Sequence, residues 1–206
     1  MRKFNLKNLS RSEKLRYLLF LLMGISFVFL IVYPVYGIDV WFWLYRIDAL
    51  GEYIRNYGIL ALPMRITESA YAGYGYGAPL FYGDIFLMIP SLFVAAGAPL
   101  LFGYCILSLE LWGGRFFIAY FSARYLLKRI QINTLGEQKY VALVFAFLYQ
   151  FFPYMVECLI SRAAMGEVSA GMILPLIVSS FCALIFSEKA EKIDAVLLAV
   201  GMSVLV

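Results

Sequence analysis

The chain has 206 residues, of which 64% are hydrophobic and only 15% are charged, and its formal net charge is +4. A water-soluble domain of this length could not bury so much apolar surface, so the composition indicates an integral membrane protein. The lack of histidine excludes histidine bases, histidine-bound metals and any Ser-His-Asp arrangement. The three cysteines are far apart and show neither metal spacing nor a disulfide framework. The net charge points to no nucleic acid partner, because basic residues concentrate at the ends of apolar segments, where membrane topology explains them.

The first segment, residues 1–16, is basic and precedes an apolar run from Tyr17 to Tyr36 that is long enough to cross a bilayer. Because basic flanks stay inside, we predict a cytoplasmic N-terminus and a first span that runs outward through the cell membrane. A signal peptide is the alternative interpretation. No small-residue cleavage site follows the run, so we predict a retained anchor.

Residues 37–99 are predicted to form the first outer loop, and Val40–Tyr57 within it has helical periodicity. At 100° per residue, Asp39, Trp43 and Arg46 fall on one side, which predicts an amphipathic helix at the membrane surface. A loop in which glycine and tyrosine alternate follows. We consider two of its tyrosines candidate ligand contacts, because a tyrosine offers a flat face and a hydroxyl: Tyr74 and Tyr76.

The segment Leu80–Gly97 decides the predicted topology, because it is apolar but carries Asp84 and Pro90. We favour a segment that dips into the interface without crossing, since this places the later basic residues inside, as the positive-inside rule prefers. The spans that follow are then predicted as Leu100–Leu127, Val141–Glu157 and Val168–Phe186. The second outer loop, at about residues 158–167, then shares the face of Asp39. A further span begins at Ile193, and we expect the protein to continue beyond Val206.

Two groups of polar residues lie near the predicted outer face. Asp39 and Arg46 are two helical turns, roughly 10 Å, apart, which suits opposite ends of one pocket. The carboxylate could act as a general base and the arginine could hold a phosphate, although both also suit interfacial anchors. Arg162 and Glu167 form the second group, where Glu167 could instead stabilise the helix that it opens through the helix dipole.

Three further ionisable residues have competing interpretations. Asp84 suits either a helix N-terminus or a binding site. Glu110 and Arg115 lie inside a predicted span, where ionisable residues usually face a partner or a cavity. They are five residues apart and do not stack on one face, so we expect separate partners and favour a structural role.

Three motifs follow one another along the chain: GIDVWFWLYRI at residues 37–47, GYGYGAPLFYGD at residues 73–84, and the run from Tyr149 through RAAMGE at residues 162–167 to Pro175. In these motifs the chain resembles the bacterial YfhO-like membrane proteins, a family often labelled as related to 6-pyruvoyl-tetrahydropterin synthase. The label does not fit this chain, since the soluble synthase needs a histidine-bound zinc. The resemblance implies membership of the polytopic GT-C glycosyltransferases, which place a catalytic carboxylate and juxtamembrane helices in the first outer loop.

The resemblance implies a role for each matching residue. Asp39 would be the base that activates an acceptor hydroxyl, and Glu167 a second acidic site residue. Arg46 and Arg162 would bind the phosphate of a polyprenyl-phosphate-linked sugar. Histidines often flank the aspartate in this family, whereas Ile38 and Trp43 stand here, so a histidine contact to the acceptor is lost. Related families differ in their use of a divalent metal, and no metal ligand is assigned.

The sequence therefore predicts an all-α, polytopic transmembrane helical bundle with a GT-C-like N-terminal module spanning residues 17–206. The predicted activity is transfer of a sugar from a polyprenyl-phosphate carrier to a cell-surface glycan or teichoic-acid-like acceptor on the outer face. The predicted catalytic residues are Asp39 and Glu167. The predicted substrate-binding residues are Arg46, Arg162, Tyr74, Tyr76 and Asp84. A lipid or glycan transporter or flippase and a non-catalytic membrane scaffold are the alternatives.

Overall fold

A computed structural model describes residues 11–32, 37–64, 66–67, 75–77, 83–131 and 135–204 of the chain. These residues are almost entirely helical, and their only β pairing is an isolated antiparallel bridge between Thr67 and Tyr76. The prediction of an all-α fold is confirmed for this part of the chain. The basic residues before position 11 and Tyr74 lie outside the described residues.

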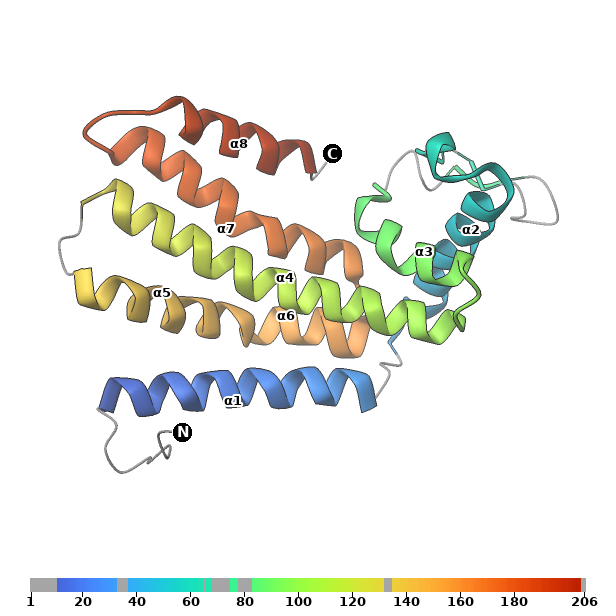
Figure 1. Cartoon of the computed structure of the whole chain (residues 1–206), viewed down its shortest axis with the longest axis horizontal. Coiled ribbons are helices and arrows are strands. Elements are labelled where there is room, and N and C mark those ends of the chain that lie inside the picture. The colour runs from blue at the N-terminus through green and yellow to red at the C-terminus, as the bar shows by residue number, and fades with distance from the viewer. Residues whose placement is uncertain are drawn as a thin grey trace, which may run out of the picture.

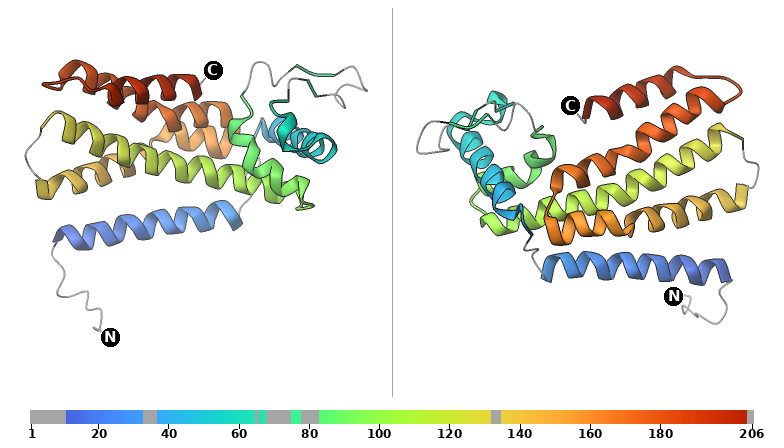
Figure 2. Two further views of the ribbon diagram at one scale, coloured as in Figure 1. Left: turned by 45° about the horizontal axis from the view of Figure 1, so that its top comes forward. Right: turned by 180° about the vertical axis from the view of Figure 1, so that it is seen from behind.

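Five helices lie side by side with their axes roughly aligned (Figure 1; Figure 2 shows the same layer from two other directions). They are α1 (Arg11–Val32), α4 (Leu100–Arg129), α5 (Leu135–Gln150), α7 (Met165–Phe186) and α8 (Lys192–Val204). Helix α4 is central, because α1, α5 and α7 all pack against it, and α8 packs on the outer side of α7. The core consists of the apolar side chains between these helices.

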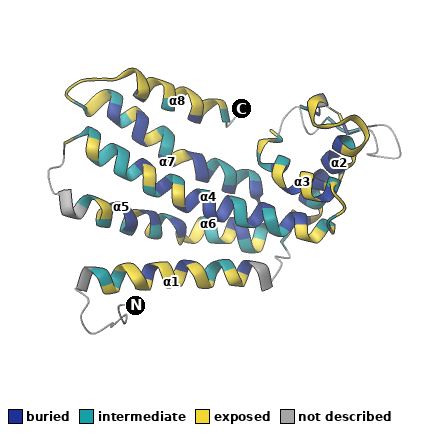
Figure 3. Cartoon of the chain, in the orientation of Figure 1, coloured by how far each residue is buried: buried dark blue, intermediate teal, exposed yellow. Residues whose placement is uncertain are grey.

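Two helices, α4 and α7, are long and apolar enough to cross a membrane by length and composition. A third span results if α5 and the bent helical segment after it are counted together. Large apolar side chains lie exposed on the outer surface of the bundle, among them Phe20 and Leu21 of α1. Exposed positions recur along α1 and α8 (Figure 3). A bilayer would solvate such a surface, which supports a membrane protein.

The predicted span Val141–Glu157 is wrong in its details, because the helix begins earlier and then breaks. Helix α5 starts at Leu135 and ends at Gln150, and α6 (Pro153–Glu157) starts after a bend of 51°. Pro153 explains the break, since proline has no N–H to donate and its ring clashes with the preceding turn. The predicted loop at residues 158–167 is also largely helical: a π-helical turn, η6 (Cys158–Arg162), continues α6, and α7 starts at Met165.

An arginine of α4 donates a hydrogen bond to a backbone carbonyl at the end of α5, where the helix breaks. The guanidinium of Arg115, which is fully buried, donates a hydrogen bond to the carbonyl of Tyr149. It also lies 4.8 Å from the centroid of the Tyr149 ring. A carbonyl freed at a helix end must find a donor where no water reaches it. Arg115 therefore has a structural partner, as expected from the sequence. That partner, Tyr149, lies on α5, whereas Glu110 lies on α4 with Arg115.

Helices α2 (Val40–Tyr57) and α3 (Met88–Ala95) pack together at one end of the bundle (Figure 1). Eight residues rise only about 12 Å, so α3 is too short to cross a bilayer. Its Ser91 hydroxyl donates 3.0 Å to the carbonyl of Ile47, which fastens α3 along α2. The described part of Leu80–Gly97 is thus a short helix at the bundle end, as we favoured, and Val40–Tyr57 is the predicted amphipathic helix.

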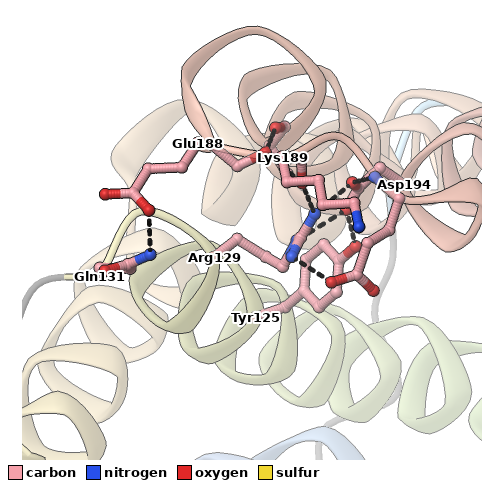
Figure 4. Close-up of polar contacts among 9 residues, drawn as sticks. Tyr125, Arg129, Gln131, Glu188, Lys189 and Asp194 are labelled. Carbon is pink, nitrogen blue, oxygen red and sulfur yellow. Dashed lines mark hydrogen bonds and ion pairs between the residues drawn. The ribbon is translucent and has the colours of Figure 1, made fainter.

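At the opposite end, α4 and α8 are joined by a charged cluster around Arg129 and Asp194 (Figure 4). Arg129 contacts Asp194 Oδ2 at 2.7 Å and Glu191 Oε1 at 2.6 Å, and it donates to the carbonyl of Lys189 at 2.7 Å. The hydroxyl of Tyr125 and the N–H of Glu191 also donate to Asp194, whose side chain is fully buried. These donors, Arg129 foremost, lower the pKa of the Asp194 carboxyl to about 2.

Replacing the Asp194 carboxylate should loosen α8. We expect Asp194→Asn to lower the free energy of unfolding by about 2 kcal/mol, because hydrogen bonds to a charged acceptor are the strong ones. Thermal unfolding in detergent at pH 7 measures this. The lowered pKa means that the contribution is fully present above about pH 4, the ordinary range of an aspartate, and is lost as the pH falls toward 2.

The matched control is Glu188→Gln, which weakens an exposed contact of 2.9 Å with Gln131 in the same cluster. An exposed contact contributes little, so this variant should change the stability by less than about 0.5 kcal/mol. Equal losses in the two variants would show that Asp194 is not the anchor of α8.

Candidate functional site

The segment before α2 lies directly against the segment between η6 and α7. A methyl group on Gly37 would lie 2.6 Å from the backbone nitrogen of Ala163, so the backbones of the two segments are in close contact. The N–H of Asp39 donates 3.0 Å to the carbonyl of Arg162, while the Asp39 side chain is exposed. The structure thus places Asp39 and Arg162 at the same end of the bundle, as predicted from the sequence.

Arg162 and Glu167 form a bidentate ion pair. Nη2 and Nη1 of Arg162 lie 2.7 Å and 3.1 Å from the two carboxylate oxygens of Glu167. Ala163, whose φ of 55° is left-handed, sits between η6 and α7 and reverses the chain so that the two residues meet. Glu167 does open α7, as expected, but its carboxylate is held by Arg162. Both side chains are 39% exposed, so the pair is accessible to a ligand.

Two residues that the sequence did not single out complete this cluster. The hydroxyl of Tyr154 donates to Glu167, and the thiol of Cys158 lies 3.3 Å from the same carboxylate oxygen. Tyr154 follows Pro153 in the third motif, which is the only signal that could have identified it. The group therefore combines one arginine, one carboxylate, a phenol and a thiol on neighbouring turns.

Arg46 and Asp84 form a second ion pair, and this one is buried. Their charged atoms are 2.6 Å apart, and their side chains are only 3% and 9% exposed. The guanidinium also lies 5.3 Å from the centroid of the Trp43 ring. Burial raises the pKa of the Asp84 carboxyl, and the adjacent guanidinium opposes that rise. Arg46 and Asp84 were both predicted to bind substrate, and the structure pairs them with each other.

A pocket of about 270 Å³ lies beside Arg46, between α2 and the N-terminal halves of α4 and α7. Its lining includes Trp43 and Arg46 from α2, Leu111 from α4, and Gly166 and Ser169 from α7. Asp39 is not among the residues that line it. This pocket therefore does not extend from Arg46 to Asp39, whose exposed side chain lies before the first turn of α2.

The remaining candidates lie apart from these two ion pairs. Tyr76 pairs its backbone with that of Thr67, at 2.9 Å and 3.1 Å, which holds these two segments together. Among the described residues, Glu110 Oε2 is buried with no hydrogen-bond partner, and Arg115 is engaged with Tyr149. No three histidine, cysteine, aspartate or glutamate side chains come together as a metal site within the described ranges.

Position 37 should tolerate no side chain larger than that of glycine, because Gly37 lies against the backbone of Ala163. Gly37→Ala places a methyl group 2.6 Å from a backbone atom, and overpacking of this kind costs about 1–3 kcal/mol. Thermal unfolding in detergent measures the loss. Gly24→Ala in α1 is the matched control, since nothing lies within 4 Å of its added methyl group, and it should leave stability unchanged or slightly higher. An unaffected Gly37→Ala protein would contradict the close approach of the two segments.

The pair Arg46–Asp84 should behave as a buried ion pair in a double-mutant cycle. Arg46→Gln or Asp84→Asn alone leaves a buried charge without its partner, which should lower the free energy of unfolding by about 3–5 kcal/mol. The double variant removes both charges, so its loss should be well below the sum of the single losses. Additive losses would indicate that the two side chains do not depend on each other.

Comparison with protein-family models finds no match, and comparisons with curated proteins and with solved structures find none either.

Proposed function

We propose that this chain forms the acceptor-activating part of a membrane glycosyltransferase that moves a sugar from a polyprenyl-phosphate carrier to a cell-envelope acceptor on the outer face. The observation that carries the proposal is the contact between the Asp39 and Arg162 segments, with an N–H to carbonyl distance of 3.0 Å. It brings together the backbones of two residues whose side chains are accessible, Asp39 and Arg162, at one end of an apolar bundle. The GT-C family resemblance of the motifs supports the same conclusion.

Asp39 suits the role of general base. Its side chain is exposed beside the first turn of α2, and it makes no capping hydrogen bond there. A carboxylate held at a fixed backbone position can take the proton of an acceptor hydroxyl as that hydroxyl attacks. The exposed position lets an acceptor arrive from the aqueous side.

Arg162 suits the role of phosphate ligand. Its guanidinium is 39% exposed, and the fork of donors that it gives to Glu167 also matches phosphate oxygens. Glu167 then orients the arginine, as a second acidic residue of the site. Arg46 is less suited to bind phosphate directly, because its ion pair with Asp84 is buried, and we assign it to the wall of the pocket beside α7.

The proposed reaction is a direct displacement. The acceptor oxygen forms a bond to the anomeric carbon while its proton passes to Asp39. The bond between the anomeric carbon and the phosphate oxygen breaks, and the polyprenyl phosphate leaves with the electron pair. Arg162 stabilises the negative charge that develops on the leaving oxygen. This mechanism inverts the anomeric configuration and needs no covalent intermediate.

The architecture suits a substrate delivered from the membrane. In this proposal α4, α7 and the bent α5–α6 unit cross the bilayer, and α2 and α3 lie at its outer surface as the juxtamembrane helices of a GT-C-like module. The basic residues Lys128 and Arg129 at the other end would face the cytoplasm, following the positive-inside rule.

Asp39→Asn should abolish transfer while leaving the protein in the membrane. Loss of a general base slows a reaction by about 10²–10⁴-fold, so the sugar should disappear from the envelope. The measurement compares the surface glycan composition of cells that carry the full-length protein or its variant at equal membrane abundance. Asp48→Asn is the matched control, because Asp48 is an exposed carboxylate on the same helix and should be dispensable.

Equal glycan composition in cells with Asp39→Asn and cells with Asp48→Asn would refute a catalytic role for Asp39. The transporter and scaffold alternatives would then take precedence. Loss of the sugar in both variants, with normal abundance, would also contradict the proposal, because it would show that any charge change on α2 has this effect.

A further inference from the structure

A second pocket of about 270 Å³ lies further along α2, away from the candidate site. Helix α2 and the segment that returns along it form its walls. The lining residues are Ala49, Glu52, Tyr53, Asn56, Tyr57, Met64 and Thr67. No step of the proposed reaction uses any of them.

Two tyrosine rings form the aromatic wall of this pocket. Tyr53 and Tyr57 are one helical turn apart, and their ring centroids are 4.9 Å apart with a tilt of 47°. Tyr57 is 55% exposed, so its ring is accessible from solvent. Exposed aromatic rings of this kind bind flat apolar patches, such as the C–H face of a sugar ring.

Three polar side chains surround the rings. Glu52 and Asn56 are exposed on α2, and Thr67 closes the pocket from the returning segment. The position of Thr67 is fixed, because its N–H and carbonyl both pair with Tyr76, at 2.9 Å and 3.1 Å. A carboxylate, an amide and a hydroxyl together can accept from and donate to several hydroxyl groups at once.

From this combination we infer that the pocket binds a saccharide, and we name it the tyrosine pocket. A neutral sugar uses both of its features, since its C–H face stacks on Tyr57 and its hydroxyls meet Glu52, Asn56 and Thr67. A quaternary ammonium group would also stack on the rings and be attracted to Glu52. It offers no hydrogen bonds, however, so Asn56 and Thr67 would contribute nothing to its recognition.

The tyrosine pocket lies on the face of α2 that carries Arg46. Tyr53 follows Arg46 by seven residues, which is about 10 Å along the helix and within about 20° around it. Asp39, the proposed base, lies a further seven residues back, so about 20 Å along the helix axis separate it from Tyr53, a distance that a short oligosaccharide spans. The pocket is therefore placed to hold the acceptor glycan while its terminal hydroxyl approaches the candidate site, and this assignment of the acceptor rests on the proposed function.

Saturation-transfer difference NMR tests the binding directly. The full-length protein is placed in lipid nanodiscs without glycosidic detergents, whose own sugars would compete. The probes are the methyl glycosides of glucose, galactose, mannose and N-acetylglucosamine, with choline chloride as the comparison. We expect at least one glycoside to show transfer to its ring C–H protons.

Tyr57→Ala should reduce that signal at least fivefold, and Asn56→Ala should reduce it more modestly. Trp41→Ala is the matched control, because Trp41 is an exposed aromatic residue elsewhere on the same helix that does not line the pocket. Asp39→Asn should bind as the unmodified protein does, so failure of the proposed reaction and failure of this site give different results.

Three outcomes would overturn the inference. The first is no transfer to any of the four glycosides, and the second is a glycoside signal that survives both Tyr57→Ala and Asn56→Ala. The third is transfer to choline alone, which would identify a site for a quaternary ammonium headgroup instead.

Discussion

The close approach of neighbouring helices to α4 determines where the polar groups of this protein meet. Small residues on α4 make that approach possible: added methyl groups at Gly103, Gly113 and Gly114 would lie within 3.2 Å of Val94, Phe27 and Met172, respectively. Apolar helices in a lipid-like environment gain little from burial alone, so close van der Waals packing at small residues holds them together. A hydrogen bond from Trp112 Nε1 to Ser26 Oγ, 2.9 Å long, links α4 to α1.

Among the described residues, the charged clusters lie at the two ends of the bundle, while Glu110 and Arg115 lie between them within α4. The cluster around Asp194 fastens α8 at one end, and the pairs Arg46–Asp84 and Arg162–Glu167 lie at the other. The contact of Arg115 with the Tyr149 carbonyl provides a donor at the end of α5, where the helix breaks. The two ion pairs at the candidate end differ in exposure. The buried pair stabilises the join between α2 and the segment before α3, whereas the accessible pair remains available to a ligand.

The helices of this chain were largely predictable, because hydrophobic periodicity and apolar length are local properties. The amphipathic face of Val40–Tyr57 and the shortness of the segment before Leu100 followed from spacing and from the distribution of basic residues. The break after Gln150 was missed, although Pro153 signals it, because the apolar run continues through the break. The pairing of Arg46 with Asp84 was also missed, since an isolated charge in a sequence does not show which other charge it will meet.

The sequence by itself determined that the chain forms apolar helices with their charges near the helix ends, since these features depend only on composition and local spacing. Only the tertiary structure decided which charges pair. Asp84 reaches Arg46 across 38 residues because α3 folds back along α2. The backbone of Asp39 meets the backbone of Arg162 because Gly37 leaves room for Ala163. Contacts of this kind depend on how closely two backbones approach, which neighbouring residues in the sequence do not encode.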